Sequence, residues 1–171
     1  DSLIKLSTDL LVMAQKEGGS LSELDKGLDE IVNSAISLES FTGKSGKIIN
    51  TYGDNMTKRV SVFGLGEDKK ITSDAIRALA SKVSAYANSL KLESFSVDGD
   101  SFGLSDSNIA QAFSEGLVLG AYEFLDYKSK KKDPNTLKTV NIFGNVDGQS
   151  IAKGEVIANG VAYARDLGNH P

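Results

Sequence analysis

Short apolar segments recur along the chain and predict a β-sheet. The run Leu10-Leu11-Val12-Met13 shows no alternation of apolar and polar residues, which is typical of a strand buried on both faces. Two further apolar runs bracket the turn residues Gly53-Asp54-Asn55, and we expect them to form an adjacent pair of strands. The predicted strands cover residues 3–6, 10–14, 47–52, 59–63, 94–97 and 139–143.

Between these strands, apolar residues recur every three or four positions, as they do on one face of a helix. The clearest predicted helix follows Thr72 or Ser73, either of which can cap it. Its apolar stripe comprises Ile76, Leu79, Val83, Ala87 and Leu90. Similar stripes predict helices over 21–35, over 109–124 after a cap at Ser105-Asp106, and over 151–163. The segment Asp98-Gly99-Asp100 is predicted to be a turn.

Strands that alternate with helices predict an α/β fold, here a three-layer α/β/α sandwich. Several early strands follow one another without an intervening helix, which favours a mixed sheet over a purely parallel one.

Two glycines lie one turn apart on the apolar stripe of the third helix. Each of Gly116 and Gly120 costs about 1 kcal/mol of helix propensity relative to alanine. We therefore expect another backbone to pass close to this stripe. Tight packing in the core is the favoured explanation, and a ligand beside the helix is the alternative. The helix is expected to run through Phe124 into a basic loop that ends near Lys132.

Composition excludes several classes of function. The formal net charge of −4 gives no general attraction to nucleic acid or to an anionic membrane. No apolar run approaches the roughly 20 residues of a membrane-spanning helix. The chain has no cysteine, so disulfides, thiolate nucleophiles and cysteine-based metal sites are excluded.

The Gly64-Leu65-Gly66 turn follows a predicted strand and precedes a helix, as a phosphate-binding loop does. It lacks the third glycine of the dinucleotide fingerprint and the Gly-Lys-Ser/Thr sequence of the Walker loop. Glu67 and Asp68 would repel a phosphate at this position. A structural turn is therefore the favoured interpretation.

Carboxylates that share an element are the remaining candidates for a metal site. They are Asp25, Asp29 and Glu30 on one predicted helix and Asp98 and Asp100 in one turn, and none forms a dense oxygen cage. The only histidine, His170, has no partner histidine. The lysines 128 and 130–132 beside Tyr122 and Tyr127 are either a solvated loop or, as the less favoured alternative, a nucleic-acid contact. We therefore assign no catalytic, cofactor-binding or metal residue.

Three segments together resemble a known family. The first contains Gly116, Leu119, Gly120, Tyr122, Phe124, Tyr127, Lys128 and Ser129. The second pairs Lys58-Arg59-Val60 with Gly64-Leu65-Gly66, and the third is Ala164 to Pro171. In this order they resemble signatures of the N-terminal domain of M17 leucyl aminopeptidases, also called cytosol aminopeptidases.

The resemblance implies a macro-domain-like fold and a non-catalytic N-terminal domain over 1–163, with 164–171 starting the junction to a catalytic domain. It implies that two divalent metal ions, Zn²⁺ or Mn²⁺, are bound by that catalytic domain, whose signatures do not occur here. It further implies a cytoplasmic homo-hexamer acting on peptides, in which this domain serves assembly, active-site access or regulation. The chain begins at Asp1 without a methionine and stops at Pro171, so we expect a fragment. A free-standing nucleotide- or ADP-ribose-binding domain and a DNA-contacting module are the alternatives.

Overall fold

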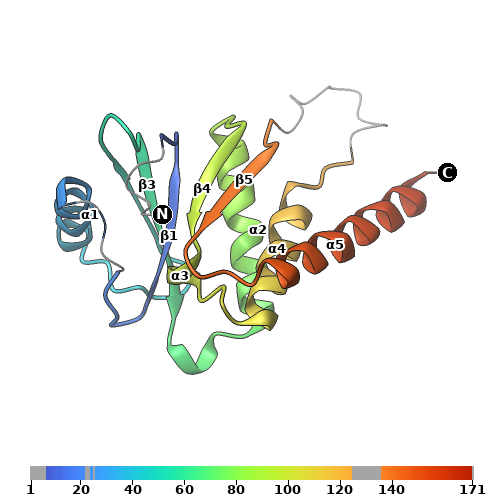
Figure 1. Ribbon diagram of the computed structural model, residues 1–171, viewed down its shortest axis with the longest axis horizontal. Helices are drawn as coiled ribbons and strands as arrows, with labels where there is room; N and C mark the ends of the chain where they lie inside the picture. Colours follow the sequence, from blue (N-terminus) through green and yellow to red (C-terminus); the bar gives the residue numbers. More distant parts are fainter. Residues whose placement is uncertain (1–6, 22–23, 25, 125–135, 171) are drawn as a thin grey trace.

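The computed structural model describes residues 7–21, 24, 26–124 and 136–170 of the chain (Figure 1). Within these residues, a five-stranded sheet has the order β2-β3-β1-β4-β5. The strands are β1 (Leu11–Lys16), β2 (Ile48–Tyr52), β3 (Arg59–Gly66), β4 (Ser94–Asp98) and β5 (Thr139–Phe143). Only β2 runs antiparallel to its neighbour, so the predicted mixed sheet is confirmed. The strand predicted over 3–6 lies outside the described residues.

The helices follow the strands closely along the chain. They are α1 (Lys26–Leu38), α2 (Ser73–Ser89), the short α3 (Gly99–Phe102), α4 (Ser107–Ala121) and α5 (Gly148–Asn169). The side chain of Thr72 accepts a hydrogen bond from the Ala75 amide, and the side chain of Asp106 accepts from the amides of Asn108 and Ile109. Both predicted N-caps are thus confirmed, and each satisfies amides that the first helical turn leaves unpaired.

Helix α1 covers one face of the sheet, α2 and α4 cover the other (Figure 1), and an apolar cluster fills each interface. Leu11, Met13 and neighbouring side chains of β2 and β3 pack against α1 on one face. Leu10, Val12 and Ala14 pack with α2 and α4 on the other face. The residues of β1 thus alternate between two cores, which confirms that this strand is buried on both sides. Helix α5 lies against α4, outside the second layer, and extends away from the body of the domain.

Several local predictions were wrong. The predicted turn at Gly64-Leu65-Gly66 lies within β3, and the helix predicted over 21–35 is α1, which begins only at Lys26. The segment after β4 is helix α3 rather than a turn, because the Asp98 side chain accepts hydrogen bonds from the amides of Asp100 and Ser101. Helix α4 ends at Ala121, and Tyr122 has extended dihedral angles, so Phe124 does not lie on the helical stripe. The last helix begins at Gly148, earlier than its apolar stripe indicated.

The two glycines of α4 confirm the expected close approach, and the neighbour is a helix. A Cβ atom added at Gly116 would lie 2.7 Å from the Cβ of Ala80, and one added at Gly120 would lie 2.6 Å from the Cα of Ser81. The backbones of α2 and α4 therefore touch along this stripe, with no room for a ligand between them.

Candidate functional site

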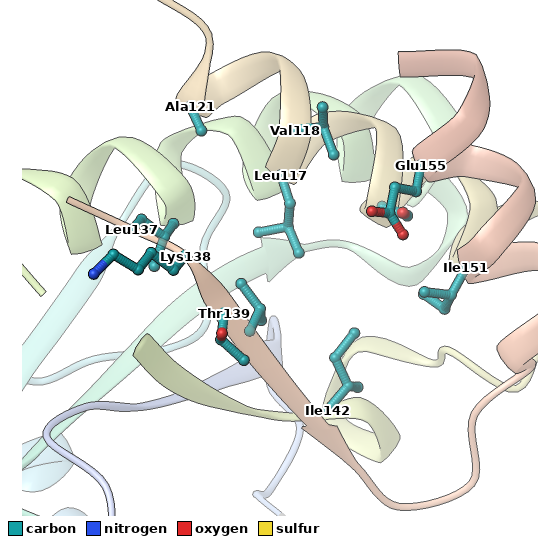
Figure 2. A pocket seen from close by; sticks show the side chains of 11 residues that line it. Leu117, Val118, Ala121, Leu137, Lys138, Thr139, Ile142, Ile151 and Glu155 are labelled. Carbon is teal, nitrogen blue, oxygen red and sulfur yellow. The ribbon is translucent and has the colours of Figure 1, made fainter. Parts of the chain in front are cut away.

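A hollow of 390 Å³ lies between α4, β5 and the first turns of α5 (Figure 2). Its walls are mostly apolar, with Leu117 and Val118 from α4, Ile142 from β5 and Ile151 from α5. Lys138 and Glu155 lie on opposite sides of Leu117, and Figure 2 shows them well apart. Apolar walls with few polar groups are typical of sites that bind small ligands.

The charged groups of this hollow do not converge on a common point. The ammonium of Lys138 lies 3.2 Å from a carboxylate oxygen of Glu93, on the strand next to it, and both side chains are exposed. Glu155 belongs to α5, across the hollow. Activation of water or of a hydroxyl needs a base within hydrogen-bond reach of the reacting group. The hollow therefore offers shape and apolar surface rather than a general acid–base pair. Its components are distant in sequence, so no motif pointed to it.

A polar network around the buried carboxylate of Glu115 joins α2 to α4. The Nε of Arg77 donates to Glu115 at 2.6 Å, and the amide of Gln111 donates to the other carboxylate oxygen at 2.7 Å. Burial raises the pKa of Glu115, but the hydrogen bonds from Gln111 and Arg77 outweigh it, so this pKa lies below its usual value. The same ion pair raises the pKa of Arg77. Each carboxylate oxygen of Glu115 accepts a hydrogen bond from within the fold, so this network has a structural role.

A second crevice lies at the carboxyl ends of β1, β3 and β4, where open α/β sheets commonly bind ligands. This crevice has a volume of 470 Å³, and Asp68, Asp100 and Lys16 are among the residues that line it. Lys16 pairs with Asp68 at 2.5 Å, and Asp100 accepts a hydrogen bond from the amide of Asn145 at 3.0 Å. The carboxylates therefore hold neighbouring loops in place.

The Gly64-Leu65-Gly66 segment, predicted to be a turn, forms the last three residues of β3 and packs against the loop that precedes β2. The amide of Gly66 donates to the carbonyl of Gly43, and the amide of Gly64 donates to that of Lys47. Gly66 has a φ of +79°, which a residue with a side chain rarely adopts. The close neighbouring backbone requires glycine at position 64, and the positive φ favours it at position 66, so both glycines have structural roles at the end of β3.

The remaining candidates are distributed over the molecule. The carboxylate of Asp29 accepts a hydrogen bond from Asn33 one turn later on α1. The ring of His170 packs edge-on against Phe124, with centroids 5.4 Å apart. Asp25 and the basic segment with Tyr127 and the lysines 128 and 130–132 lie outside the described residues. In the part of the chain that the structure describes, no group of three or more His, Cys, Asp or Glu is arranged to hold a metal ion.

Tyr122 ties the end of α4 to the end of α5. Its hydroxyl donates to Asp166 at 2.6 Å, which raises the pKa of Tyr122, and the guanidinium of Arg165 lies 5.7 Å from its ring centroid. These two residues belong to the Ala164–Pro171 segment, and Tyr122 belongs to the other motif of the resemblance. Tyr122 thus links the described parts of the two motifs, a contact that their separation in sequence did not reveal.

Helix α5 has one partnered face and one exposed apolar face. Gly154 and Ala158 are buried against α4. Val156, Tyr163 and Leu167 are 73%, 65% and 60% exposed, and spacings of seven and four residues place them on one stripe. Ile157 and Val161 are 40% and 38% exposed and lie between this stripe and the buried face. The helix runs without interruption across positions 163 and 164, where the sequence predicted a domain boundary.

Two of the three motifs lie within one family description, and Ala164–Pro171 follows it along the chain. Residues 10–131 match the N-terminal domain of the cytosol aminopeptidase family. The chain is 33% identical over 165 residues to a probable cytosol aminopeptidase from Sulfurihydrogenibium sp. (strain YO3AOP1), which covers 92% of this chain and 33% of that relative. The chain belongs to the cytosol aminopeptidase family.

A probable cytosol aminopeptidase from Persephonella marina is 32% identical over 170 residues, covering 91% of this chain and 34% of its own length. The chain thus spans about a third of the length of the cytosol aminopeptidases that it matches. No helix within the described ranges is long and apolar enough to cross a lipid bilayer.

Solved structures share the fold of this family member. A tomato leucine aminopeptidase variant superposes with a TM-score of 0.76 at 24% identity, over 100% of this chain and 37% of that one. The bottromycin maturation enzyme BotP superposes with a TM-score of 0.73 at 21% identity, over 96% of this chain and 33% of that one. A second BotP structure, with a TM-score of 0.71 and 21% identity, is a complex with Mn and covers 96% of this chain and 32% of that one. The described residues of our chain offer no ligand set for such a metal.

Proposed function

We propose that this chain is the N-terminal, non-catalytic domain of a metal-dependent aminopeptidase that removes N-terminal residues from peptides. The proposal is carried by the match to the N-terminal domain of the family and by a length of about a third of the relatives. The polar groups of the described crevices support it, because they are engaged with each other and do not converge on a reacting atom.

Helix α5 is the proposed connection to the catalytic domain. Its stripe of Val156, Tyr163 and Leu167 is apolar and exposed, and burying such a stripe stabilises a helix against a partner. Tyr122 fixes the direction of α5 through Asp166, so the position of a docked domain would be set by the fold. In this arrangement residues 1–163 are the domain body, and 164–171 begin the junction.

The other family properties form part of the same proposal. The catalytic domain would bind two divalent ions, Zn²⁺ or Mn²⁺, and the full protein would be a cytoplasmic homo-hexamer. The name of the relatives supports the location, and the Mn complex of BotP supports the metal type. This domain would then serve assembly, access to the active site or regulation. A macro-domain-like fold is part of the same proposal.

A chimera tests the proposal. This chain replaces the N-terminal third of the Sulfurihydrogenibium relative, and release of a chromogenic leaving group from an aminoacyl substrate is measured with Mn²⁺ or Zn²⁺. We expect the chimera to be active and the chain alone to be inactive. Leu167→Lys should lower the thermal midpoint of the chimera because it places a charge in the buried junction. Ile157→Lys, which lies about 100° around α5 from Val156 and is 40% exposed, is the matched control. Turnover by the chain alone would refute the proposal.

A further inference from the structure

Strand β2 forms one edge of the sheet, and no described strand pairs with its outer side. The carbonyl of Lys47 accepts from the Gly64 amide, and the amide of Gly53 donates to the Lys58 carbonyl. Hydrogen-bonded positions alternate along an antiparallel pair, so residues 47, 49, 51 and 53 direct their backbone groups toward β3. Ile48, Asn50 and Tyr52 consequently direct theirs outward.

In the part of the chain that the structure describes, this outer edge lacks the usual protection against another strand. Sheet edges are commonly blocked by lysine, proline, a bulge or a covering segment. Between Ile48 and Tyr52 there is no charged residue, proline or bulge. Instead, Ile48 and Tyr52 are 40% and 78% exposed on the same face of the strand, with Asn50 between them.

The opposite face of the same edge is hollow. Helix α1 and Thr51 of β2 line a shallow groove of 430 Å³. Ile31, Ala35 and Leu38 of α1 lie along it at helical spacing, and Leu38 is 84% exposed. The core position of this turn is taken by Val32, so Ile31 faces the groove rather than the sheet. Glu30 is the acidic residue of the groove.

We propose that β2 pairs antiparallel with β2 of a second copy of this chain, across a two-fold axis at Asn50. In this register Ile48 of each copy lies opposite Tyr52 of the other, which forms two aromatic–β-branched pairs of a kind that stabilises sheets. The axis is perpendicular to the sheet, so both α1 helices lie on the same side. Their Leu38 and Ile31 side chains then face each other above the joined strands.

Charge complementarity favours a second copy over an unrelated strand. In the same register, Lys47 lies opposite Gly53 of the second copy and diagonal to its Thr51. Thr51 lines the groove together with Glu30, so the ammonium of each Lys47 faces the groove carboxylate of the other copy. A two-fold axis repeats this pair, as expected for an isologous interface.

This interface lies at the edge of the sheet farthest from β5 and α5, as Figure 1 shows. It therefore does not depend on the proposed junction with a catalytic domain. Its failure would leave the family assignment and the aminopeptidase proposal unchanged, and an inactive chimera would leave this interface unchanged.

Sedimentation velocity of the full 171-residue chain over a concentration series tests the pairing. We expect a monomer–dimer equilibrium, and we expect Tyr52→Lys to raise the dimer Kd at least tenfold by placing a charge on the edge. Tyr163→Lys is the matched control, since it removes another tyrosine that is more than half exposed, from α5. A chain that stays monomeric at all concentrations would overturn the proposal, as would a dimer that Tyr163→Lys dissociates and Tyr52→Lys does not.

A charge exchange tests the identity of the partner. Lys47→Glu and Glu30→Lys should each raise the dimer Kd about tenfold, because each places like charges together at two symmetric positions. The double variant should return the Kd to within about threefold of the original. Both residues are exposed, so neither change should impair folding, and circular dichroism checks this. Additive losses in the double variant would overturn the proposed register.

Discussion

At the scale of single residues, Arg77 and Glu115 form an ion pair between α2 and α4. The Glu115 side chain is almost fully buried, whereas that of Arg77 is one-third exposed, so solvent screens part of the attraction. We expect Glu115→Gln to lower the free energy of unfolding by about 1 kcal/mol at neutral pH. Urea denaturation of both proteins measures this difference.

The pH dependence of the same variant has a definite sign. The folded-state pKa of Glu115 lies below its ordinary value of 4.5, so the unfolded chain takes up the proton first as the pH falls. The stabilisation by this carboxylate is therefore complete above that value and declines below it. The difference between wild type and Glu115→Gln should shrink in acid. A difference that grows as the pH falls would show that the ion pair is not the source.

A second prediction at this scale concerns the glycines of α4. Gly120→Ala gains helix propensity but drives a methyl group to 2.6 Å from the Ser81 backbone, so the helices must separate. We expect a net loss of about 2 kcal/mol in the free energy of unfolding. Gly160→Ala on α5 is the control, because nothing lies within 4 Å of its Cβ position. That variant should gain up to about 1 kcal/mol. Equal effects of the two changes would contradict helix-to-helix contact at Gly120.

At the scale of elements, α5 combines a packed start with an exposed end. Gly154 and Ala158 are its buried residues, and both precede Ala162. Local opening is easiest where few apolar contacts must be broken. We expect the amides of 163–169 to exchange with solvent hydrogen faster than those of α2, as measured by hydrogen exchange with mass spectrometry. In the chimera with the catalytic domain, this contrast should diminish. Uniform protection along α5 in the isolated chain would refute this expectation.

Periodicity predicted well those elements whose structure depends on residues nearby in the sequence. The limits of β5 and the stripe of α2 follow from local patterns, and Thr72 and Asp106 act as caps through hydrogen bonds to amides two or three residues away. The end of α4 could not be predicted, because Tyr122 leaves the helix to bond Asp166, a residue 44 positions away. The hollow beside β5 and the exposed face of α5 likewise depend on how distant segments pack.

At the scale of the whole molecule, the two unpartnered surfaces lie at opposite ends of the sheet. The edge strand β2 with α1 forms one end, and β5 with α5 forms the other (Figure 1). A domain with two separate docking surfaces can join a partner domain through one of them and a second copy through the other. Substitutions at Tyr52 should therefore change self-association without affecting the junction, and substitutions at Leu167 should do the reverse.

Removal of divalent metal ions should affect the isolated chain and the chimera differently. Within the described residues, no set of carboxylates and histidines converges to bind a divalent ion. We expect EDTA to leave the thermal midpoint of the isolated chain unchanged, since a ligand stabilises a fold only where it binds the native state. Added Zn²⁺ or Mn²⁺ should produce no release from an aminoacyl chromogenic substrate. The chimera, assayed in parallel, should lose its activity in EDTA and regain it with metal. A midpoint of the isolated chain that falls in EDTA would show that this domain binds a structural metal of its own.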